Sequence, residues 1–228
     1  MTGRSIKFVL ATCLATVLLG CASMGDIRAH MAFVDTTLRQ HPEITLHKQC
    51  YNGIELHWAS RGSPQKAVVV WLHGTPGEWT EAGRLYVNEQ LLSQTLLVSV
   101  DRPGWGESLP VNHPKSGSLS QLALFESQAA SLVPFIRNLK AAYPHLPLYL
   151  AGHSWGASLA PYLAVEARES IDGLLLFAGA YDPGLARPRW YHRWANTRLL
   201  KLVLGDALEQ ANDEMLALPI GLRAMENQ

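Results

Sequence analysis

The sequence predicts a doubly wound α/β fold whose sheet is mainly parallel. Short, uniformly apolar runs recur along the chain, as is typical of strands covered on both faces. They alternate with amphipathic stretches long enough to form crossover helices. The 228 residues, 48% of them hydrophobic, suffice for one domain with a buried core. Acidic and basic residues are equal in number, so the charge gives no indication of nucleic-acid binding.

The first residues have the character of an export signal. Arg4 and Lys7 precede the apolar run FVLATCLATVLL, which is shorter than the roughly 20 residues of a membrane-spanning helix. The last two leucines of this run and the next two residues form LLGC, residues 18–21, which resembles the lipobox of bacterial lipoproteins. This resemblance implies a signal peptide over residues 1–20, lipidation of Cys21 and anchoring to the cell envelope. Ala22 after the cysteine implies the outer membrane. An ordinary secretory signal with an incidental cysteine is the alternative.

A β-hairpin is predicted where the strand pattern begins. The segments ITLHKQC and IELHWAS flank Asn52-Gly53, a dipeptide that favours the positive φ angles of a tight turn. The apolar runs that follow predict inner parallel strands at residues 67–72, 95–100, 146–151 and 171–179. Helical periodicity between these strands predicts helices at residues 78–94, 118–143 and 154–168, the second opened by a capping box of Ser118 and Gln121.

Unusual residues follow three of the predicted strands. The segment HGTPG, residues 73–77, comes after the first inner strand, DRPGWGES, residues 101–108, after the second, and GHSWG, residues 152–156, after the third. Ligands bind at the carboxyl ends of strands in open parallel sheets. The sequence therefore predicts that the three turns form one site.

Ser154 in GHSWG is the candidate nucleophile. A Gly-x-Ser-x-Gly match alone is weak, but here an apolar strand precedes the pentapeptide and a helix follows it. Such a turn holds the serine in a strained conformation, with glycines where no side chain fits. The serine oxygen then lies at a helix N-terminus, where free N–H groups stabilise negative charge.

An acyl-transfer nucleophile also needs N–H donors aimed at the oxyanion that forms. Trp155, directly after the serine, supplies one backbone N–H. The second is predicted to come from HGTPG, with Thr75 as the donor.

Together, HGTPG, DRPGWGES and GHSWG resemble the α/β-hydrolase fold superfamily, with the motifs in that family's order. The resemblance covers about Ile44 to Asp182, within a hydrolase core assigned to residues 21–182. It implies a serine esterase, amidase, proline-iminopeptidase-like or lipase-like hydrolase that acts on a small ester or amide without a cofactor or metal. Branches with an aspartate nucleophile, such as epoxide hydrolases, are disfavoured because the elbow holds Ser154.

Four further residues in these turns are interpreted as structural. They are the histidines and the acid–arginine pair within the motifs: His73, His153, Asp101 and Arg102. All four are expected to hold their loops together rather than to contact substrate.

Candidates for the catalytic acid and base lie after Ser154 in the chain. In the superfamily the acid usually follows the next strand and the histidine follows the last strand. Asp182 lies at the first of these places, although an aspartate before Pro183 also suits a turn. Asp206 is an alternative acid if LKLVLGD is a strand. His192, the one histidine after Ser154, completes the order Ser154, Asp182, His192 but falls in a predicted lid.

Residues 183–228 are predicted to be a lid-like helical segment. Their large apolar residues share helix-like spacing: Trp190, Trp194, Leu204, Leu208, Met215 and Leu218. No final strand with a histidine is evident, so the sequence predicts a C-terminally incomplete hydrolase fold, through truncation or frameshift, with an apolar edge at residues 171–179.

Two functions therefore stay open. One is a serine hydrolase that forms an acyl-enzyme on Ser154, or a truncated and inactive form of one. The other is a non-catalytic α/β-hydrolase-like lipoprotein that binds a ligand or partner. The sequence determines neither the substrate nor the oligomeric state.

Overall fold

A computed structural model describes residues 39–112, 119–180 and 206–226, together with Ala29, residues 32–34 and residues 36 and 37. The chain divides into two units, Met1–Pro42 and Glu43–Gln228. In the first, Thr37 Oγ1 donates to the carbonyl of Phe33 at 2.7 Å, as in a helical turn. The second contains the sheet and the three predicted turns. Within the described residues, no helix is both long enough and apolar enough to cross a bilayer.

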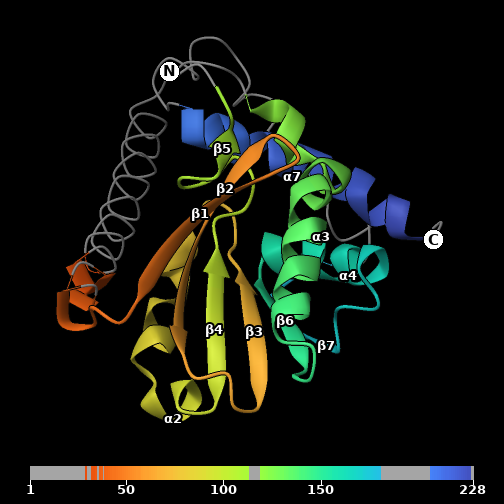
Figure 1. Cartoon of the computed structure of the whole chain (residues 1–228). Coiled ribbons are helices and arrows are strands. Elements are labelled where there is room, and N and C mark those ends of the chain that lie inside the picture. The colour runs from red at the N-terminus through yellow and green to blue at the C-terminus, as the bar shows by residue number, and fades with distance from the viewer. Residues whose placement is uncertain are drawn as a thin grey trace, which may run out of the picture. The chain divides into compact units, whose positions relative to one another are not determined.

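The second unit is built on one mixed sheet (Figure 1). Its strands lie in the order β1-β2-β4-β3-β6-β7, and β5 pairs with β2. Strands β4, β3, β6 and β7 run parallel, while β2 is antiparallel to both β1 and β4. The bounds are β1 Thr45–Tyr51, β2 Ile54–Gly62, β3 Ala67–Leu72, β4 Thr95–Val100, β5 Leu109–Pro110, β6 Leu148–His153 and β7 Gly173–Phe177. The predicted α/β fold with a mainly parallel sheet and an N-terminal hairpin is confirmed.

The hairpin turn has the geometry that its sequence predicts. Tyr51 pairs with Ile54, so Asn52 and Gly53 form a two-residue loop. Their φ angles are 48° and 81°. Two consecutive positive φ angles give the turn a twist that matches the twist of the flanking strands.

The helices agree with the predictions in place but not in all their limits. They are the 3₁₀ helices η1 Trp79–Val87 and η2 Ser120–Ala123, and the α-helices α2 Glu89–Leu92, α3 Phe125–Ala142, α4 Trp155–Glu166 and α7 Asp206–Glu226. The single helix predicted at residues 78–94 is instead η1 followed by α2. Asn88 separates the two, because its side chain accepts a hydrogen bond from Leu91 N–H and caps α2.

The helix predicted from residue 118 starts later. Leu124 has extended backbone angles, φ −86° and ψ 148°, and α3 begins at Phe125. The short η2 precedes this break, and Ser118 of the predicted capping box lies outside the described residues. The third predicted helix corresponds to α4.

Helices cover both faces of the sheet, as a doubly wound fold requires. On one face, α3 and α4 pack on the inner strands (Figure 1), and their side chains join those of β3, β4 and β6 in one core: Leu132, Ile136, Leu159, Leu163, Val70, Leu72, Val100 and Leu150. On the other face, η1 is tied to the sheet by hydrogen bonds. Tyr86 Oη donates to the Ala59 carbonyl at 2.9 Å, and Ser99 Oγ donates to the Trp79 carbonyl at 2.8 Å.

Helix α7 belongs to the segment predicted to be lid-like. It crosses the end of the sheet toward which the arrow of β4 points (Figure 1). Leu218 and Leu222 are buried and join the main core. Asp206 lies in this helix, so LKLVLGD does not end in a strand there. Residues 181–205, with Asp182, His192 and the two tryptophans, lie outside the described residues.

Strand β7 is an edge of the described sheet. Its one neighbour in the described part of the chain is β6. The side chains of Leu175, Leu176 and Phe177 are between 36% and 50% exposed. An apolar edge at this strand is what the sequence predicts.

Gly221 sets how closely α7 approaches α3. A Cβ at this position would lie 2.7 Å from Cδ2 of Phe125, which is itself buried. Glycine to alanine in an exposed helix stabilises by about 1 kcal/mol. Here the overpacking cost, about 1–3 kcal/mol, outweighs that gain. We predict that Gly221→Ala lowers the free energy of unfolding, measured by denaturant titration.

The matched control is Ile220→Ala, because Ile220 is the adjacent residue and is 59% exposed. Its effect should stay within about 0.5 kcal/mol of zero. A Gly221→Ala protein that is more stable than the wild type would contradict the packing of α7 on Phe125.

Candidate functional site

Ser154 occupies a strained turn between a strand and a helix. Strand β6 ends at His153 and helix α4 begins at Trp155. Ser154 has φ 51° and ψ −116°, which are unusual angles for a residue with a side chain. Strain of this kind persists only where the surrounding structure imposes it, and it is typical of the nucleophile elbow.

The two glycines of GHSWG show what imposes the strain. A Cβ on Gly152 would lie 2.6 Å from the Gly156 carbonyl oxygen. A Cβ on Gly156 would lie 2.3 Å from the Leu72 carbonyl oxygen at the end of β3. Both distances are far below van der Waals contact, so only glycine fits. The elbow therefore packs directly on the end of β3.

This packing brings Ser154 against the HGTPG loop. A Cβ on Gly74 would lie 3.1 Å from the Cβ of Ser154. Two of the three sequence motifs thus meet at the carboxyl ends of β3 and β6, where the parallel sheet predicts a site.

Backbone N–H groups at this point are available to a ligand. In the first turn of α4, Ala157 and Ser158 donate to the Ser154 carbonyl at 3.1 and 3.2 Å. Within the described part of the chain, no acceptor is found for the N–H of Trp155 or of Thr75. By contrast, Gly74 N–H donates to Glu81 Oε2 at 3.0 Å. Of the residues in the HGTPG loop, Thr75 is therefore better placed than Gly74 to act as an oxyanion donor.

Glu81 also holds His153. The imidazole Nδ1 lies 3.1 Å from Glu81 Oε1, and the same oxygen accepts from Trp71 Nε1 at 3.2 Å. The His153 side chain is 44% exposed, so it does not pack in the core. Glu81 was not singled out from the sequence. It does not directly follow a predicted strand. It lies in η1, which has no regular helical face on which an unusual carboxylate would stand out.

His73 is a structural histidine, as predicted from the sequence. It is fully buried, its Nδ1–H donates to the Gly74 carbonyl at 2.7 Å and its Nε2 accepts from Arg102 N–H at 3.0 Å. Burial, and then the neighbouring Arg102 charge, hold the pKa of His73 well below its usual value. Since the ring is neutral and both nitrogens are engaged, His73 is not a base for Ser154.

Asp101 ties the DRPGWGES loop to its surroundings. Its carboxylate accepts from the N–H groups of Trp79, at 2.6 Å, and Glu107, at 3.0 Å. Its Oδ2 also lies 2.8 Å from Nδ1 of the buried His57. These partners belong to three separate segments, so the aspartate fixes the loop and does not face a ligand.

Arg102 is the centre of a buried network beneath the HGTPG loop. It is fully buried, and its Nε donates to the His73 carbonyl at 2.9 Å. Its Nη2 donates to the Gly74 carbonyl at 2.9 Å and to Thr75 Oγ1 at 2.7 Å. The guanidinium carbon also lies 4.3 Å from the ring centroid of Trp155. Arg102 therefore contacts both residues predicted to supply oxyanion donors.

Glu214 of α7 completes this network. Its carboxylate is fully buried and accepts from Arg102 Nη1 at 2.8 Å, Trp105 Nε1 at 2.9 Å and Gln128 Nε2 at 2.7 Å. Thr75 Oγ1 also donates to it. Glu214 was not predicted from the sequence. The available signal was its position on the apolar face of α7, four and eight residues before Leu218 and Leu222.

The described part of the chain places no histidine on the Ser154 hydroxyl. Apart from His73 and His153, the buried His57 is bonded to Asp101, and His47 lies 2.8 Å from Ser60 Oγ. Asp182 and His192, the predicted acid and base, lie outside the described residues, as does Cys21. The described site therefore contains the predicted nucleophile, Ser154, and the residues predicted to supply oxyanion donors, Thr75 and Trp155.

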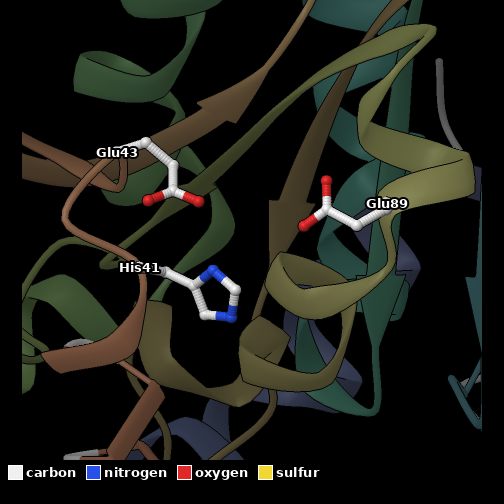
Figure 2. Close-up of side chains that lie close together, drawn as sticks. All are labelled: His41, Glu43 and Glu89. Atoms are coloured by element: carbon white, nitrogen blue, oxygen red, sulfur yellow. The ribbon is translucent and has the colours of Figure 1, made fainter.

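A pair of carboxylates far from the elbow is explained by an ion pair. Glu43 and Glu89 turn their carboxyl groups toward the same space (Figure 2). Arg61, whose side chain is buried, donates to both, to Glu89 at 2.7 Å. One guanidinium between two carboxylates offsets their mutual repulsion.

Comparisons with known proteins find relatives named as an iminopeptidase and an epoxide hydrolase. The sequence is 31% identical over 130 residues to a protein of Mycoplasma pneumoniae named "Putative proline iminopeptidase", covering 56% of this chain and 37% of that protein. It is 28% identical over 134 residues to a soluble epoxide hydrolase of Corynebacterium sp. strain C12, covering 59% of this chain and 41% of that enzyme. The matches thus span about two fifths of the length of these relatives.

A solved structure shows the same fold. The Cif epoxide hydrolase of Acinetobacter nosocomialis superposes with a TM-score of 0.61 at 15% identity, covering 88% of this chain and 75% of that one. The family described as serine aminopeptidase S33 matches residues 63–216, a range that includes Thr75, Ser154 and Glu214. The chain belongs to this serine aminopeptidase S33 family, within the α/β-hydrolase fold.

Proposed function

We propose that the protein is a serine hydrolase that cleaves carboxylic esters or amides through an acyl-enzyme on Ser154. The observation that carries the proposal is the elbow. Ser154 is held at φ 51° at the N-terminus of α4, against a loop whose Thr75 N–H has no acceptor in the described structure. A hydroxyl beside unpaired N–H donors is the arrangement that acyl transfer needs.

In the proposed reaction, Ser154 Oγ attacks the carbonyl carbon of the substrate as its proton passes to a base. The carbonyl π electrons move to oxygen, and the N–H groups of Thr75 and Trp155 donate to the resulting oxyanion. Collapse of this intermediate expels the alcohol or amine, which takes up the proton. Water then gives a proton to the same base and attacks the acyl carbon; the bond to Ser154 Oγ breaks, the acid is released, and Ser154 Oγ takes up the proton.

The relatives support a hydrolase but differ in what their names say they act on. One is named as an iminopeptidase and another as an epoxide hydrolase. We favour an ester or amide substrate because a serine occupies the elbow of this chain and because the matching family is described as serine aminopeptidase.

The proposal predicts covalent labelling by a fluorophosphonate. Ser154 Oγ should displace fluoride from phosphorus, since the oxyanion donors also stabilise the phosphonyl oxygen. Intact-mass spectrometry should show one adduct per chain, and peptide mapping should place it on Ser154. The Ser154→Ala protein should not be labelled.

The base is tested in the same assay. Ser154, Asp182 and His192 follow the chain order of the superfamily, so His192→Gln should slow labelling by roughly 10²–10⁴-fold if His192 is the base. His145→Gln is the matched control, because His145 lies at the loop before β6, away from the elbow. A folded wild-type protein that is not labelled would exclude acyl-transfer activity for this chain and favour a binding role.

We propose further that the protein is anchored to the membrane by lipid on Cys21, following the LLGC motif. Cys21→Ala should then move the protein from the membrane fraction to the soluble fraction and remove incorporation of a labelled fatty acid. Cys50→Ala is the control, since Cys50 is an exposed free thiol of the sheet. Unchanged fractionation and labelling of the Cys21→Ala protein would contradict the anchor.

A further inference from the structure

We propose that Glu214 is a positioning residue that fixes the two oxyanion donors of the site, and so couples helix α7 to the reactivity of Ser154. The inference rests on the proposed serine hydrolase function. It is carried by one observation: Glu214 contacts both Thr75 and Trp155, the residues that supply the two N–H groups.

The contact with Thr75 is made by the carboxylate. Thr75 Oγ1 donates to Glu214 Oε2 and accepts from Arg102 Nη2 at 2.7 Å. The hydroxyl is thus held from both sides, by an acceptor and a donor of opposite charge. Charge-assisted hydrogen bonds of this kind are stronger than neutral ones. With its side chain fixed from both sides, the Thr75 backbone has little freedom to rotate.

The contact with Trp155 is made by the backbone of the same residue. Trp155 Nε1 donates to the Glu214 carbonyl at 3.3 Å, and the Arg102 guanidinium stacks 4.3 Å from the Trp155 ring. The indole is fully enclosed. Trp155 is the first residue of α4, so the same contacts locate the helix end that presents its N–H.

Water cannot replace these contacts. The side chains of Arg102 and Glu214 are both 0% exposed. Arg102 Nη1 and Gln128 Nε2 both donate to Glu214 Oε1, at 2.8 and 2.7 Å, and Trp105 Nε1 donates to the same atom. A buried carboxylate with this many donors has one favourable position.

A purely structural ion pair predicts a different outcome. Loss of such a pair would change stability, but the fluorophosphonate would react with Ser154 of the folded variants at the wild-type rate. A positioning role predicts that the rate of the covalent step falls while probe affinity and the fold are retained. Thr75 separates the two, because its hydroxyl can be removed without breaking the Arg102–Glu214 pair.

The first test compares Thr75→Val with Thr75→Ser. Valine keeps the shape of threonine but removes the hydroxyl, whereas serine retains it. Thr75→Val should lower the maximal rate of fluorophosphonate labelling at Ser154 by roughly 10–100-fold. This effect should not exceed that of removing a whole oxyanion donor, which is roughly 10²–10³-fold. The probe concentration at half-maximal rate should change by less than about twofold. Thr75→Ser should restore the wild-type rate.

The second test compares Glu214→Gln with Asp213→Asn, the same chemical change at the preceding position of α7. Glu214→Gln should slow labelling at least as much as Thr75→Val, and Asp213→Asn should react like the wild type. Should Glu214→Gln fail to fold, the Thr75 pair decides. Wild-type rates for both Thr75→Val and a folded Glu214→Gln would overturn the inference.

A third measurement does not depend on activity. Amide hydrogen exchange at Gly74, whose N–H donates to Glu81 Oε2, should be at least tenfold faster in Glu214→Gln and Thr75→Val, with exchange in β3 unchanged. If the wild type is not labelled, the proposed function fails and this measurement alone judges the positioning role. Unaltered exchange in the loop would overturn it.

Discussion

The Arg102 guanidinium is enclosed by protein and donates to segments that are far apart in the sequence. It binds the carbonyls of His73 and Gly74, the Thr75 hydroxyl and the carboxylate of Glu214 on α7. A guanidinium removed from water is tolerated only when its hydrogens and its charge are matched. The requirement to match them brings the HGTPG loop, the DRPGWGES loop and α7 to one point. The site therefore depends on this residue, although it does not face a ligand.

A second constraint, which is steric rather than electrostatic, fixes the backbone conformation of Ser154. The backbone of the elbow lies so close to the end of β3 that a Cβ on Gly156 would be 2.6 Å from the His73 carbonyl oxygen. This approach imposes the strained angles of Ser154 and leaves the N–H of Trp155 without an intrahelical acceptor. Glu81 engages the Gly74 N–H, which leaves Thr75 better placed than Gly74 to donate to an oxyanion.

The parts of this architecture that rest on local patterns could be predicted from the sequence. The inner strands at residues 67–72 and 95–100 have the predicted limits, because a short apolar run bounded by turn residues is typical of a strand covered on both faces. The hairpin at Asn52-Gly53 and the elbow at Ser154 are likewise local. The predicted start of α3 was wrong by several residues, because helical periodicity does not reveal that Leu124 adopts extended backbone angles. Glu214 was missed because its partners, Arg102 and Thr75, come from loops more than 100 residues earlier.

The central claim is that Ser154 attacks a substrate whose developing negative charge is received by Thr75 and Trp155. The most direct measurement is a crystal structure of the phosphonylated protein. We predict the phosphorus on Ser154 Oγ and the phosphonyl oxygen about 2.7–3.1 Å from the backbone nitrogens of both Thr75 and Trp155. A phosphonyl oxygen directed away from these nitrogens, or bound instead by Gly74 N–H after its release from Glu81, would contradict the claim.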